Sequence, residues 1–92
     1  MHFMLSWTHD GAEAPDVEIA ACLQDLPQQE VFPRCRVVQV PGFAVYETVH
    51  ERLNTIDAPG FRFIMSPIAS TGRYYGKLPE DVARAVNDLS DQ

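Results

Sequence analysis

The chain has 92 residues, of which 46% are hydrophobic and 22% are charged, with a formal net charge of −6 and a pI near 4.8. This length and composition predict one globular domain over residues 1–92 and argue against a disordered chain. The acidic balance argues against a general nucleic-acid binder, because affinity for phosphates comes mainly from lysine and arginine.

Neither the first residues nor the apolar runs indicate export or a membrane span. Residues 1–7 lack the basic flank of a signal peptide, and no run approaches the ~20 apolar residues that cross a bilayer. Cys22 and Cys35 lack metal-ligand or C-x-x-C spacing. We therefore expect reduced thiols in a cytoplasmic protein, with a single disulfide as the alternative.

A strand at residues 2–8 and a helix from Asp16 to Leu26 are expected first. In the strand, one face carries Phe3, Leu5 and Trp7, and the other carries His2, Met4 and Ser6. Pro15 and Asp16 suit a helix start, and Pro27 ends the helix. The polar segment from Gln28 to Pro33 is expected to be irregular.

The centre of the chain has two interpretations. In the first, Arg36 to Val40 and Phe43 to Glu47 form a hairpin around the turn dipeptide Pro41-Gly42. A helix from Val49 to Ile56 then begins after Thr48, which with Glu51 matches a capping box. In the second, Phe43 to Ile56 is one helix, because Tyr46, Val49, Leu53 and Ile56 recur at helical spacing, and the sheet loses a strand.

In the C-terminal third, the residue pattern predicts a strand from Phe61 to Ile68, a loop from Ser70 to Lys77 and a helix after Pro79. That helix carries Val82, Val86 and Leu89 on one face. With the hairpin, the order is β-α-β-β-α-β plus one helix. It predicts an α+β, ferredoxin-like domain, whose four-stranded antiparallel sheet carries two helices on one face.

The face of the sheet away from those two helices is expected to be half apolar. The helix side would receive Phe3, Leu5, Val37, Val45, Phe61, Phe63 and Met65. The opposite side would carry Met4, Val38, Val40, Tyr46 and Ile64, with His2, Ser6, Arg36 and Arg62 among them. Such a face is seldom bare, so the last helix, a second subunit or a ligand would cover it. The interface candidates are Met4, Arg36, Val38, Tyr46, Arg62 and Ile64.

Two segments could carry chemistry. The loop from Ser70 to Lys77 combines hydroxyls, glycines, cations and aromatic rings, and could hold an anion or a partner through Ser70, Thr71, Arg73, Tyr74, Tyr75 and Lys77. It lacks the phosphate-loop pattern, and the alternative is a plain connection in which the tyrosines cover the sheet edge.

Asp10 beside His9 is the second candidate, as a metal ligand with a neighbouring proton carrier. The alternative is a simple turn at Asp10-Gly11, since one carboxylate makes no metal site by itself. No two histidines have zinc-ligand spacing, and neither cysteine has a histidine or a helix start beside it. We therefore predict no metal site and no cysteine nucleophile.

The segments M-H-F-M-L-S-W-T, the hairpin, and F-R-F-I-M-S-P-I followed by G-R-Y-Y-G-K-L-P resemble a group of small bacterial proteins. The group includes the CRISPR-associated small ferredoxin-like nuclease, virulence-associated protein D and short relatives of both. The resemblance implies a homodimer packed through its sheets. In some members it implies Mg²⁺-dependent cleavage of RNA or DNA by an aspartate after the first strand, a position that Asp10 would take here.

Three functional hypotheses follow from the sequence. The first is a non-enzymatic, dimeric protein-interaction or regulatory module without a cofactor. The second is a metal-dependent ribonuclease in which Asp10 binds the metal and Arg73 or Lys77 holds phosphate. The third is a small-ligand pocket between the sheet and the last helix.

Overall fold

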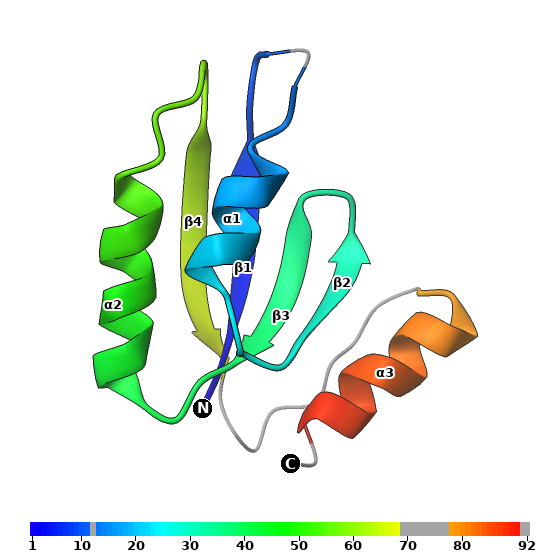
Figure 1. The fold of residues 1–92 in the computed structure, drawn as a ribbon. Helices are drawn as coiled ribbons and strands as arrows, with labels where there is room; N and C mark the ends of the chain where they lie inside the picture. Colours follow the sequence, from blue (N-terminus) through cyan, green and yellow to red (C-terminus); the bar gives the residue numbers. More distant parts are fainter. Residues whose placement is uncertain (12, 69–77, 91–92) are drawn as a thin grey trace.

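The computed structural model describes residues 1–11, 13–68 and 78–90 (Figure 1). The elements are listed here in chain order: β1 His2–Thr8, α1 Asp16–Cys22, β2 Gln28–Phe32, β3 Cys35–Gln39, α2 Phe43–Asn54, β4 Arg62–Ile68 and α3 Glu80–Ser90. The strands form one sheet in the order β2-β3-β1-β4, and each neighbouring pair is antiparallel. The α+β class, the four-stranded antiparallel sheet and the β-α-β-β-α-β-α order are therefore confirmed.

The hairpin lies earlier in the chain than we predicted. Gln28–Phe32 is a strand, not an irregular segment, and it pairs with β3 across a turn at Pro33-Arg34. Arg34 takes a left-handed φ of 62°, which closes this turn. Gln28–Phe32 has little apolar alternation to reveal it, because it is an edge strand stabilised mainly by its pairing with β3.

The predicted strand at Phe43–Glu47 is wrong, and the single-helix alternative holds for this segment. α2 begins directly after Gly42, and the amide of Tyr46 donates to the carbonyl oxygen of Gly42 at 3.2 Å. Thr48 lies inside the helix, where its hydroxyl donates to the carbonyl oxygen of Ala44 at 2.9 Å, so it caps no helix start. The sheet keeps four strands because Gln28–Phe32 supplies the one that this helix removes.

α1 is shorter than the predicted helix from Asp16 to Leu26. It ends at Cys22, and Asp25 takes a left-handed φ of 66° in the turn that follows. The left-handed conformation of Asp25 and the restriction that Pro27 places on Leu26 are incompatible with a helix that continues to Leu26.

The main core lies between the sheet and the helices α1 and α2. It consists of Phe3, Leu5, Trp7, Ile19, Cys22, Leu23, Val38, Val40, Val49 and Leu53. The β1–β3 register places Val38 opposite Phe3 and Arg36 opposite Leu5. Directly opposed residues point to the same side of a sheet. Arg36 and Val38 therefore face α1 and α2, and the predicted orientation of β3 is inverted.

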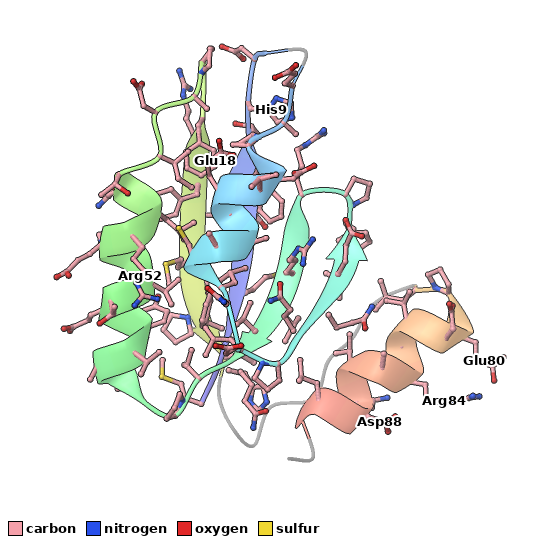
Figure 2. The ribbon with its side chains drawn as sticks, in the orientation of Figure 1. His9, Glu18, Arg52, Glu80, Arg84 and Asp88 are labelled. Carbon is pink, nitrogen blue, oxygen red and sulfur yellow. The ribbon has the colours of Figure 1, made fainter. Side chains whose placement is uncertain are left out.

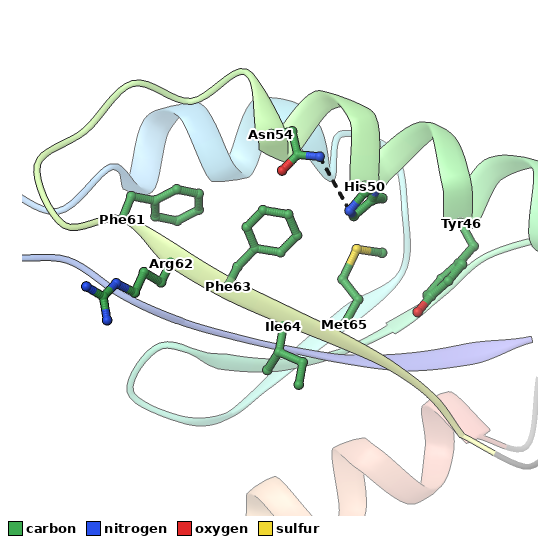
Figure 3. Close-up of a pocket in the computed structure, with 8 residues that line it drawn as sticks. All are labelled: Tyr46, His50, Asn54, Phe61, Arg62, Phe63, Ile64 and Met65. Atoms are coloured by element: carbon green, nitrogen blue, oxygen red, sulfur yellow. Dashed lines mark hydrogen bonds between the residues drawn. The ribbon is translucent and has the colours of Figure 1, made fainter.

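α3 lies on the other side of the sheet from α1 and α2 (Figure 3) and packs on β2 and β3. Val86 and Leu89 of α3 are buried, as are Cys35 and Val37, the β3 residues on this side. The charged side chains of Glu80, Arg84 and Asp88 point away from the sheet (Figure 2). The last helix therefore covers the β2–β3 half of this face. None of the helices in the described part of the chain is long and apolar enough to cross a membrane.

Candidate functional site

A groove with a volume of about 490 Å³ runs between α2 and β4 (Figure 3). α2 contributes Tyr46, His50 and Asn54, which lie four residues apart and so share one face of the helix. The amide nitrogen Nδ2 of Asn54 lies 3.4 Å from His50 Nε2. This contact joins the polar side chains of His50 and Asn54 on the α2 side of the groove.

The opposite wall of the groove is aromatic. Phe61, Phe63 and Met65 point toward α2, whereas Arg62 and Ile64 point to the other side of β4 (Figure 3). The rings of Phe61 and Phe63 are stacked with centroids 5.7 Å apart, and the imidazole of His50 lies 5.7 Å from the ring of Phe63. These contacts hold the wall in place without closing the groove.

This wall is less buried than the adjacent strand. Phe3 and Leu5 of β1 are 0% exposed, whereas Phe63 and Met65, which point to the same side from β4, are only half buried. The difference arises because β4 is at the edge of the sheet and α2 does not cover it fully. Among the described strands β4 pairs with β1 alone, so its outer edge has no strand beside it.

The β1–β4 half of the sheet face opposite α1 and α2 is a second candidate surface. The paired residues on it are His2 with Ile68, Met4 with Ser66, Ser6 with Ile64, and Thr8 with Arg62. Ile64 is 68% exposed, which is high for a large apolar side chain in the middle of a strand. We call these residues the open half-face, with the exception of His2, which is buried and contacts the carbonyl oxygen of Leu89 in α3.

The predicted interface residues separate into three places. Met4, Arg62 and Ile64 lie on the open half-face, as expected. Arg36 and Val38 lie on the helix side, where Arg36 Nη1 donates to Gln28 Oε1 at 2.7 Å. Tyr46 is on α2 and contacts Phe3 edge-on at 5.2 Å, so the helix, not the sheet, positions it.

Asp10 follows β1 and packs on the loop before β4. Its amide donates to the carbonyl oxygen of Pro59 at 2.8 Å, and its carboxylate occupies the space beside Gly60 that a Cβ would need. His9 Nδ1 lies 3.1 Å from the carbonyl oxygen of Gly11. No group of three or more His, Cys, Asp or Glu side chains that could hold a metal occurs in the described ranges.

Both cysteines are free and buried, in agreement with the expectation of reduced thiols. They lie on opposite sides of the sheet, since Cys22 belongs to the main core and Cys35 pairs with Ser6 of the open half-face. The Ser6 hydroxyl donates to Cys35 Sγ at 3.3 Å. Burial raises the pKa of the Cys22 thiol, and the positive charge of Arg52 offsets this only in part.

The predicted anion or partner loop, with Ser70, Thr71, Arg73, Tyr74, Tyr75 and Lys77, lies outside the described residues. Sequence reasoning missed the α2–β4 groove because it assigned the first part of α2 to a strand. The i, i+4, i+8 spacing of Tyr46, His50 and Asn54 was the signal for it.

Comparisons with protein-family models, with curated proteins and with solved structures gave no match to this chain. Its function is therefore argued from the two surfaces that the fold builds around β4.

Proposed function

We propose that the chain is a ferredoxin-like protein-interaction module that forms a homodimer through its open half-face. Support for the ferredoxin-like assignment comes from the strand order, in which β1 lies between β3 and β4 and each crossover contains one helix. The observation that carries the dimer is Ile64, which is 68% exposed on the half of the sheet away from β2 and β3, the strands on which α3 mainly packs.

The charge of this surface favours a second copy as its occupant. The chain carries a net charge of −6, so two copies repel each other over most orientations. The open half-face contains Arg62 but no aspartate or glutamate. Two copies can therefore meet here without opposing carboxylates, and each Ile64 loses its contact with water.

Light scattering of Ile64→Asp tests the dimer. A two-fold interface contains each residue twice, so we expect a dissociation constant raised by about 100-fold or more. Val17→Asp is the matched control, because Val17 is 80% exposed on α1, away from the open half-face. A wild-type monomer at roughly 100 μM, or equal weakening by both substitutions, would contradict the proposed dimer.

A metal-dependent ribonuclease centred on Asp10 is the competing proposal. It requires ligands beyond the single carboxylate of Asp10, such as the Asp10 carboxylate of a second copy. RNA cleavage that needs Mg²⁺ and that Asp10→Asn abolishes, with the dimer intact, would support it. Cleavage that Asp10→Asn leaves unchanged would remove its basis.

A further inference from the structure

We infer that the α2–β4 groove binds an extended, acidic segment of a partner protein, which adds to the outer edge of β4 as a further strand. This inference rests on the proposed protein-interaction function and names the chemistry of the partner. The groove wall formed by Phe61, Phe63 and Met65 lies on the other side of β4 from the open half-face, and Arg62 and Ile64 border both surfaces.

The backbone of β4 provides the first argument. An edge strand presents unpaired N–H and C=O groups, and an extended peptide can pair with them along the edge. Proteins often block such edges with prolines or charges. In β4 the proline, Pro67, and the charge, Arg62, lie near its two ends, and Phe63–Met65 between them has neither. As far as the described residues go, the middle of β4 is therefore open to strand addition.

The half-buried wall provides the second argument. Every second side chain of an added strand would point toward α2, over Phe63 and Met65 and beside His50. These wall residues still expose apolar surface, whereas their partners on β1, Trp7 and Leu5, are only 6% and 0% exposed. The volume of about 490 Å³ accommodates several side chains of an incoming strand. An apolar side chain at alternate positions of the partner would complete this part of the core.

The charge of the groove residues favours an acidic partner segment. Among the eight side chains that line the groove, Arg62 is positively charged and none is a carboxylate, in a chain whose net charge is −6. A segment with carboxylates at the positions that alternate with its apolar side chains would pair with Arg62, which points to the other side of β4.

Fluorescence anisotropy with short labelled peptides tests this inference. The probe is a peptide of alternating valine and glutamate, compared with its valine–lysine counterpart and with a version N-methylated at alternate amides. We expect the acidic peptide to bind at least about tenfold more tightly than the lysine peptide. N-methylation on the edge that faces β4 should abolish binding, because it removes the backbone donors.

Two protein variants locate the site. His50→Glu puts a carboxylate beside the positions that the apolar side chains of the peptide would occupy, and should weaken peptide binding about tenfold or more. Ala44→Glu adds the same charge at another exposed position of α2 that does not line the groove, so it should leave binding nearly unchanged. The fluorescence of Trp7, the single tryptophan, reports whether each variant is folded.

The inference is overturned if the acidic peptide fails to bind at about 1 mM, if the lysine peptide binds equally, or if His50→Glu and Ala44→Glu have the same effect. Peptide binding and dimer formation are measured separately. Loss of the dimer with peptide binding intact would refute only the dimer. A dimer without peptide binding would refute the groove while leaving the proposed dimer standing.

Discussion

His2 Nε2 lies 3.1 Å from the carbonyl oxygen of Leu89, so the second residue of the chain contacts the end of its last helix. A carbonyl oxygen only accepts, and the imidazole therefore carries its hydrogen on Nε2. The contact is buried and connects β1 to α3, on the side of the sheet away from α1 and α2.

Replacing His2 should loosen α3 more than the rest of the domain. We expect His2→Ala to reduce the free energy of unfolding by about 1–3 kcal/mol, because it leaves a buried carbonyl oxygen without its donor. Hydrogen exchange of the amides in 80–89 should accelerate, while that of β1 and β3 changes less. His9→Ala is the control, since the hydrogen bond of His9 stays within its own loop, to the carbonyl oxygen of Gly11. Unchanged exchange in α3 would refute this assignment.

Gly60 should be intolerant of a side chain for two reasons. Its φ of +67° is disfavoured for other residues, which is the larger effect, and an added Cβ would displace the exposed Asp10 carboxylate. We expect Gly60→Ala to lower the free energy of unfolding by about 1–3 kcal/mol in urea titrations. Adding Asp10→Ala to Gly60→Ala should recover only the part of the lost free energy of unfolding that comes from the contact between the new Cβ and the Asp10 carboxylate. Gly42→Ala, at an extended φ of 176° with nothing within 4 Å, should cost much less.

Thr48 distinguishes the observed helix from the predicted one. If Thr48 capped a helix start, its substitution by alanine would lower the free energy of unfolding by about 1 kcal/mol. In the structure its hydroxyl bonds back to Ala44 within α2, an arrangement that slightly destabilises a helix. We therefore expect Thr48→Ala to change the free energy of unfolding by less than about 0.5 kcal/mol, or to increase it slightly. Urea unfolding followed by Trp7 fluorescence measures this difference, and a loss near the capping value would contradict it.

Cys22 should make stability fall at alkaline pH. Burial raises the pKa of its thiol in the folded protein above that in the unfolded chain. The unfolded chain therefore releases its proton first, at a pH near 8.5, and stability declines as pH rises through the folded pKa. The free energy of unfolding of Cys22→Ala should decline less over this range than that of wild type. Identical slopes for the two proteins would contradict the assignment.

The same burial should protect both thiols from reagents. Cys22 and Cys35 are 8% and 7% exposed, and thiolates, not thiols, are the reactive species. We expect both to react with a thiol-specific disulfide reagent at a rate limited by opening of the native structure, and at full speed in urea. Fast reaction of either thiol in the native protein would place it at the surface.

The sequence predicted correctly those elements in which buried apolar residues recur at regular spacing. The alternation of Phe3, Leu5 and Trp7 predicted β1 and its core face, and the spacing of Val86 and Leu89 predicted the buried side of α3. These patterns are readable because one face of the element meets the core and the other does not.

β3 shows where such patterns fail. Arg36–Val40 carries valine on both sides, and both sides are covered, by α1 and α2 on one and by α3 on the other. A strand buried on both faces has no apolar alternation from which its orientation could be read. The pairing of Val38 with Phe3 fixes the orientation, and only the register of the assembled sheet contains that information.

Local periodicity is enough to predict the α+β class, the strands β1 and β4, and the apolar face of α3. Long-range contacts make Gln28–Phe32 a strand and Phe43–Asn54 a helix. The first is stabilised by its ladder with β3, and the second by packing of Val49 and Leu53 into the main core. The α2–β4 groove exists only because that helix and the edge strand β4 lie beside each other, a relation between segments that local sequence does not encode.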